Sequence, residues 1–135
     1  MNRSVLLGYQ WATALSDTCT GVLLYVAPAF TLRMMGVHAP ASAIPYVGYI
    51  GAFVLSVGLA CAYGAYLMHI CACVERIETV WLLTAFSRAA VATYLLQAIL
   101  SGAFEPAWIS VVVFDTACVV VQGIGLRGKW LRYAQ

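Results

Sequence analysis

The chain has 135 residues, of which 64% are hydrophobic and 9% are charged, with a formal net charge of +2 at pH 7. A water-soluble domain of this length needs far more polar surface than so few charged residues supply, so the composition indicates an integral membrane protein. The small net charge comes with no basic patch of the kind that binds nucleic acid.

Four apolar segments each approach the length of about 20 residues that a helix needs to cross about 30 Å of hydrocarbon. They are predicted at residues 5–27, 45–68, 79–100 and 106–126. Helices are expected because each apolar run is continuous, and because an open sheet in lipid would leave backbone groups unpaired. Pro28 and residues 36–45 are expected to end the first helix, and residues 101–106 to form a tight third turn.

Short links between four spans favour an all-α, antiparallel up-down-up-down bundle, with residues 1–135 forming a single transmembrane domain. Among loop residues, one predicted face carries only Arg33. The opposite face carries five cationic residues: Arg3, Arg76, Arg127, Lys129 and Arg132. The positive-inside rule therefore places both termini in the cytoplasm.

Three ionisable residues, Asp17, Arg88 and Asp115, stand near the middle of three different segments. A charge left at the centre of a bilayer costs roughly 2.5–3.5 kcal/mol, so such residues normally face the bundle interior and pair. Counted at about 1.5 Å per residue, all three lie about 14–16 Å from the cytoplasmic side. We expect the planar guanidinium of Arg88 to bridge both carboxylates. The expected role of this cluster is structural: it acts as a clasp that fixes which helices are neighbours. The alternatives are a site for a ligand or proton, and polar contacts with a partner subunit.

Other polar residues extend this layer at helical spacing. Thr13 and Thr20 stand at i−4 and i+3 from Asp17, Thr84 at i−4 from Arg88, and Gln122 at i+7 from Asp115. Hydroxyl and amide groups commonly bridge membrane helices, each contributing about 0.6 kcal/mol on average, so a structural role is expected for them.

The second segment carries a small residue at every fourth position: Gly48, Ala52, Ser56, Ala60 and Gly64. Such a ladder lets two helix backbones approach closely in lipid, where apolar burial alone does not favour protein over acyl chain. The ladder predicts either packing within the bundle or contact with a second chain in a homo- or hetero-oligomer.

His69, near the end of the second segment, is a candidate axial ligand for haem or a chlorophyll magnesium, although an interfacial anchor is the simpler interpretation. His38 falls near the opposite face, so the two histidines cannot form one bis-histidine site. The sequence contains no G-x-S-x-G or H-E-x-x-H motif, and we predict no catalytic residue and no metal site. No cofactor is predicted, although a groove between short helices has room for a lipid, quinone or pigment.

The run Asp17-x-x-Thr20-Gly21-x-Leu23-Leu24, followed by Ala27-Pro28 and Leu32-Arg33-x-x-Gly36, resembles the first helix of a group of bacterial membrane proteins. These are small, uncharacterised four-helix proteins, loosely DoxX-like in size and layout. Arg88, Asp115 and the pair Gln122-Gly123 are similar to positions in that group. The resemblance implies a four-helix fold in a bacterial inner (cytoplasmic) membrane and implies no particular activity.

The expected function is that of a non-catalytic accessory subunit of a larger membrane complex. Its partners would be other integral membrane subunits and membrane lipids. The alternative is a small binding or transport protein that uses the charge layer as a site for a quinone, lipid or proton. A third hypothesis, a small enzyme subunit with borrowed cofactors, requires a redox centre within reach.

Overall fold

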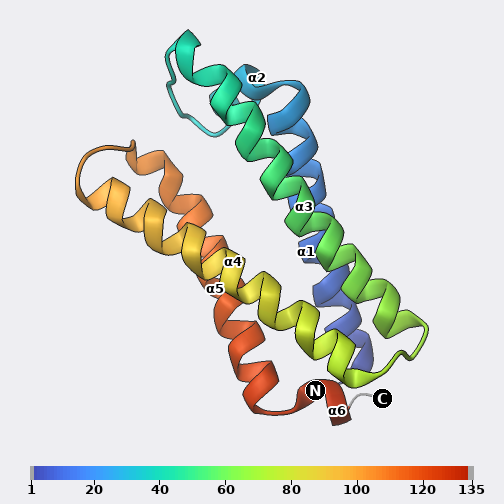
Figure 1. Cartoon of the computed structure of the whole chain (residues 1–135). Coiled ribbons are helices and arrows are strands. Elements are labelled where there is room, and N and C mark those ends of the chain that lie inside the picture. Colours follow the sequence, from blue (N-terminus) through green and yellow to red (C-terminus); the bar gives the residue numbers. More distant parts are fainter. Residues whose placement is uncertain (1, 134–135) are drawn as a thin grey trace.

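The computed structural model describes residues 2–133, and every regular element in this range is helical. Four helices are long: α1 (Arg3–Val26), α3 (Ile44–His69), α4 (Val74–Leu100) and α5 (Ile109–Arg127) (Figure 1). Four elements are short: α2 (Pro28–Met34), α6 (Trp130–Tyr133) and the 3-10 turns η1 (Ala41–Ala43) and η2 (Pro106–Trp108). Three segments are long and apolar enough to cross a membrane: Ala41–His69, Val74–Leu100 and Pro106–Arg127. The described residues therefore confirm an all-helical fold with three helices that are long and apolar enough to span a membrane.

The predicted helix bounds need two corrections. The third long helix begins at Val74 and not at residue 79. Pro28 does not lead directly into a loop, because it is the first residue of α2. Proline disfavours helical geometry in the residue before it, and Ala27 accordingly breaks the helix between α1 and α2, with φ −136° and ψ 57°. At the first position of a new helix proline's missing N–H costs nothing, so the chain resumes as a short helix.

The end of α2 depends on a glycine. Gly36 has a φ of +72°, the left-handed conformation that side chains other than glycine rarely adopt. It follows the helix and lets the N–H of Val37 donate to the carbonyl of Leu32 at 2.9 Å, as in a Schellman motif. The chain then turns through residues 37–40 and enters α3.

Helices α1 and α3 pack with their backbones in close contact, and glycines make this contact. A Cβ atom added to Gly51 would lie 2.5 Å from the backbone nitrogen of Tyr25, and one added to Gly58 would lie 2.6 Å from that of Thr18. A Cβ on Gly21 would collide with the backbone of Leu55. Close approach of this kind is how small residues stabilise helix pairs in membranes.

The predicted ladder on α3 is not a single internal packing face. Each step of four residues turns about 40° around a helix, so the ladder winds from one side of α3 to another. Gly64 is buried against Gln10, whereas Ala52 and Ser56 are exposed. Internal packing through Ala52 and Ser56 was therefore the wrong expectation, and Gly51 and Gly58 make that contact instead. Contact of the exposed part with a second chain stays a prediction.

Both described ends of the chain lie at the same end of the molecule as the turn between α3 and α4 (Figure 1). Near the start of α1, Arg3 donates to the carbonyl of Met68 at 2.9 Å. In α6, Arg132 donates to the Glu78 carboxylate of α4 at 3.0 and 3.2 Å, and these hydrogen bonds raise the pKa of Arg132 above its usual value. This end is therefore held together by contacts of the first and last helices with the α3–α4 region.

Two apolar clusters lie towards opposite ends of the molecule. The cluster near the termini is formed by Leu6, Leu67, Met68, Ile77, Trp81 and Leu131. The cluster near α2 is formed by Leu24, Leu32, Val37 and Val47. Polar side chains occupy the interior between the two clusters, and they form the site described next.

Candidate functional site

Arg88 binds two carboxylates from two other helices in the interior of the protein. Its Nη1 donates to Oδ1 of Asp115 on α5 at 2.7 Å, and its Nη2 donates to Oδ2 of Asp17 on α1. The exposed fractions of Arg88, Asp17 and Asp115 are 3%, 7% and 8%. The predicted bridge across three helices is present, and each charge in it has a partner of opposite sign.

Two further groups enclose the guanidinium. The sulfur of Cys61 on α3 accepts a long hydrogen bond of 3.9 Å from Nη2, and the ring of Phe114 lies 5.4 Å from Cζ in a cation–π contact. All four long helices therefore supply a group around the cluster, either bound to Arg88 or packed on it. Such an arrangement can hold α1, α4 and α5 in one register, because breaking either ionic contact leaves a buried charge unpaired.

The residues predicted to extend the layer behave in different ways. Nε2 of Gln122 on α5 donates to the Thr84 hydroxyl of α4 at 2.8 Å, so these two predicted residues do meet. Thr13 is buried, but its hydroxyl donates to carbonyls of its own helix, those of Tyr9 at 3.2 Å and Gln10 at 3.0 Å. Thr20 is half-buried and does not join the cluster. A threonine hydroxyl in a helix readily bonds the carbonyl three or four residues earlier, which satisfies Thr13 without a neighbouring helix.

Sequence reasoning missed Gln10, which belongs to the same layer. Its side chain is fully buried, and Nε2 donates to the carbonyl of Cys61 on α3 at 2.9 Å. Gln10 stands seven residues before Asp17, a spacing that returns to the same helix face, so the sequence did carry a signal for it. Among the described residues, three buried polar atoms lack a hydrogen-bond partner: Oε1 of Gln10, Oε1 of Gln122 and Nε1 of Trp81.

His69 lies apart from this interior. It is exposed at the end of α3, and its carbonyl oxygen accepts a hydrogen bond of 3.4 Å from Arg3. Residues 2–133 contain no group of three or more His, Cys, Asp or Glu residues that could hold a metal ion. A single axial bond from His69 to a pigment or haem stays a prediction.

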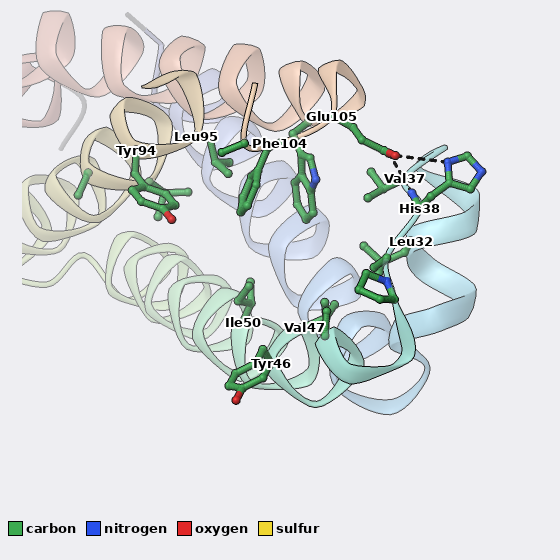
Figure 2. Close-up of a pocket in the computed structure, with 17 residues that line it drawn as sticks. Leu32, Val37, His38, Tyr46, Val47, Ile50, Tyr94, Leu95, Phe104 and Glu105 are labelled. Carbon is green, nitrogen blue, oxygen red and sulfur yellow. Dashed lines mark hydrogen bonds and ion pairs between the residues drawn. The ribbon is translucent and has the colours of Figure 1, made fainter. Parts of the chain in front are cut away.

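A cavity of about 650 Å³ opens between α3 and α4 at the end of the molecule away from the termini (Figure 2). Tyr46, Val47 and Ile50 of α3 form one wall, and Tyr94, Leu95 and Phe104 lie across from them. Residues of α2, η2 and the adjoining loops complete the lining, which contains none of the three charged residues of the cluster. The sequence pattern did not indicate this cavity, because its lining comes from five separate parts of the chain.

A polar contact crosses one end of the cavity. The backbone N–H of His38 donates to Oε2 of Glu105 at 2.9 Å, and Nδ1 of His38 lies 3.6 Å from Oε1 of the same carboxylate. Figure 2 shows both contacts between the segment after α2 and the turn after α4. Two segments that lie 67 residues apart in the sequence are thereby joined at the outer end of the cavity.

Comparisons with protein-family models, with curated proteins and with solved structures found no match. The resemblance to DoxX-like four-helix proteins stays a prediction.

Proposed function

We propose that this chain is a non-catalytic accessory subunit of a larger membrane complex. In this proposal the chain crosses the membrane four times, with both termini on the cytoplasmic side. The cluster of Asp17, Arg88 and Asp115 holds its helices together, and its outward helix faces bind other integral membrane subunits.

The proposed fourth span is α1. Its 24 residues extend about 36 Å, enough to cross about 30 Å of hydrocarbon. What makes α1 less apolar than the other long helices is a set of polar residues, and Gln10, Thr13 and Asp17 are all buried within the protein. Residues such as Leu15, Val22 and Val26 are exposed instead. The surface that α1 offers to lipid is therefore mainly apolar, which supports a membrane-spanning role.

The proposed orientation rests on where the cationic residues lie. Arg3 and Arg132 both contact the α3–α4 region, at the end of the molecule that also holds Arg76, Arg127 and Lys129. The other end, where His38 meets Glu105, carries Arg33 of α2. The positive-inside rule assigns the first end to the cytoplasm.

A structural role for the charge cluster is supported by its geometry. Arg88 is enclosed by two carboxylates, a thiol and an aromatic ring, and it is almost inaccessible to solvent. The alternative role, in which the charge layer binds a quinone, lipid or proton, requires a path to Arg88. The cavity of Figure 2 is lined by other residues, so it does not support that alternative.

The observation that carries the accessory role is the exposure of small residues on α1 and α3. Ala52 and Ser56 lie on the exposed side of α3, while other residues make its contact with α1. Gly8, Ala12 and Ser16 repeat every four residues on the exposed side of α1. Small residues that the chain's own packing leaves outside allow a second chain's helix to approach both backbones closely.

The proposal is tested by photocrosslinking in the native membrane, which needs no matching group on the partner. A benzophenone-bearing residue replaces Ala52 in one variant and Leu83, an exposed residue of α4, in a control. The expected result is a crosslinked product of defined mass through position 52 and none through position 83. Co-purification of a partner in fixed stoichiometry in mild detergent would accompany it. A stable monomer in mild detergent, with no product through position 52, contradicts the proposal.

A further inference from the structure

We propose that the cavity between α3 and α4 holds one acyl chain of a phospholipid from the leaflet on the His38–Glu105 side, with the phosphate bound by Arg33. This site is separate from the charge cluster and does not depend on the accessory role. Four features of the cavity lead to the assignment: its depth, its side opening, its lining and the charge beside its outer end.

The cavity is about as deep as one leaflet. On α4 its lining begins at Ala90, two residues from Arg88, and continues to the turn that contains Glu105. The α4 part of the lining ends at Leu95, and the lining resumes at Ala103, after the end of the helix at Leu100. From Ala90 to Leu100 the helix is about 15 Å long, which is half of the roughly 30 Å of bilayer hydrocarbon. A cavity that ends near the middle of the membrane fits the length of an acyl chain from a single leaflet.

The cavity opens sideways towards the lipid. Its floor is made of buried residues, with Leu32, Val47 and Leu95 exposed by 2%, 7% and 7%. Tyr46 and Tyr94 also line it, yet 72% and 63% of their surfaces are exposed, and Figure 2 shows them on opposite walls. A lipid chain can therefore enter between α3 and α4 without crossing the polar contact at the outer end.

The size and lining of the cavity suit an apolar chain. Its volume of about 650 Å³ falls within the range of about 300–1,000 Å³ that is typical of small-molecule sites. Apart from His38 and Glu105 at the outer end, the lining consists of aliphatic residues, aromatic residues and a proline. A ligand with many polar groups would find few partners in the deeper part, whereas methylene groups pack well there.

Arg33 supplies the charge that a phosphate requires. It is exposed on α2, and its guanidinium makes no ion pair with any residue between 2 and 133. Arg33 and His38 together line a smaller hollow of about 220 Å³, which shares Leu32 and Val37 with the large cavity. An arginine fork binds phosphate oxygens in a bidentate manner, so a lipid chain seated in the cavity would have its phosphate group near a suitable cation.

The first experiment is photolabelling of the full chain in phosphatidylcholine nanodiscs that contain a small fraction of lipid with a diazirine at the middle of one acyl chain. We expect labelling of Val47, Ile50 and Leu95 to exceed that of Leu83 and Ile124, which lie on lipid-facing surfaces elsewhere. Equal labelling of the two sets would overturn the proposal. This measurement uses the unmodified protein, so it does not depend on the folding of any variant.

The second experiment counts the phospholipid retained per chain by native mass spectrometry after transfer to mild detergent. Ala90→Trp fills the cavity, and we expect retention to fall at least about fivefold, because the indole takes the place of packed methylene groups. Ala117→Trp, on the exposed side of α5 and outside the cavity lining, is the matched control and should leave retention unchanged. Arg33→Gln should weaken retention of phosphatidylcholine but not of diacylglycerol with the same chains. Retention that is equal in the two tryptophan variants, or a polypeptide bound in place of lipid, would overturn the proposal.

Discussion

Arg88 of α4 and Asp17 of α1 form an ion pair that links two helix pairs across the interior. Helix α1 packs along α3, and α4 packs along α5, so most backbone contacts lie within these pairs. Arg88 also binds Asp115 within its own pair at 2.7 Å. The guanidinium of Arg88 therefore makes one ion pair within its helix pair, with Asp115, and one between the helix pairs, with Asp17. Loss of Arg88 removes both ion pairs.

The first prediction concerns Arg88→Leu. This change leaves two buried aspartates without their cation, and breaking a buried ion pair by removing one partner typically costs about 3–5 kcal/mol. We expect the free energy of unfolding to fall by that amount, measured by reversible unfolding in detergent micelles. The free energy of unfolding of Arg88→Lys should lie between those of wild type and Arg88→Leu, because one ammonium group cannot contact both carboxylates as the forked guanidinium does.

A triple variant serves as the control for this prediction. Replacing Asp17 and Asp115 by Leu together with Arg88→Met removes all three charges at once. Exchanging a whole buried ionic cluster for apolar residues of similar volume is often neutral or stabilising. The triple variant should therefore regain most of the stability that Arg88→Leu loses. If Arg88→Leu alone were as stable as wild type, the cluster would not be a clasp.

The second prediction separates two glycines of the same helix. A Cβ on Gly21 would collide with the backbone of Leu55, whereas one on Gly8 would meet no atom within 4 Å. Gly21→Ala should force α1 away from α3 and lower the free energy of unfolding by about 1–3 kcal/mol. Gly8→Ala should raise it by up to about 1 kcal/mol, because alanine is the better helix former. Both are measured by unfolding in detergent, and equal effects would refute backbone contact between α1 and α3.

The charge cluster was predictable because a charge inside an apolar segment has few acceptable environments. Asp17, Arg88 and Asp115 also fall at similar depths when residues are counted from the segment ends, so their meeting followed from helix geometry. The position of Gln10 could have been predicted in the same way, since it lies on the same face of α1 as Asp17. Spacing could not show that the hydroxyl of Thr13 would bond its own helix, because that choice depends on local side-chain geometry.

The packing of α3 was less accessible from the sequence. A ladder of small residues at every fourth position commonly indicates a packing face. The face of α3 that contacts α1, however, contains Gly51 and Gly58, which are seven residues apart. Which of two small-residue faces turns inward depends on the partner helix, here on Gly21 and its neighbours. The cavity was less accessible still, because residues of α2, α3 and α4 meet around it only after the helix pairs have assembled.

The third prediction concerns the hydrogen bond between Gln122 and Thr84, 2.8 Å long. A double-mutant cycle with Thr84→Val and Gln122→Leu isolates its contribution to the free energy of unfolding. Hydrogen bonds between membrane helices contribute about 0.6 kcal/mol on average and at most about 1.7 kcal/mol, so we expect a coupling energy in that range. A coupling energy of zero would mean that Gln122 stabilises the protein only by its bulk.

The fourth prediction tests the contact between His38 and Glu105 at the outer end. The backbone N–H of His38 donates to the Glu105 carboxylate, while the imidazole is 90% exposed. Glu105→Ala removes the acceptor, so the His38 amide should exchange with deuterium about 2- to 10-fold faster, the factor that corresponds to roughly 0.5–1.5 kcal/mol for one hydrogen bond. His38→Ala keeps the backbone N–H and loses only an exposed side chain, so protection of residues 37–40 should persist. Exchange mass spectrometry of the peptide covering these residues makes the comparison. Equal acceleration in the two variants would show that the imidazole, and not the backbone hydrogen bond, holds this segment against the turn after α4.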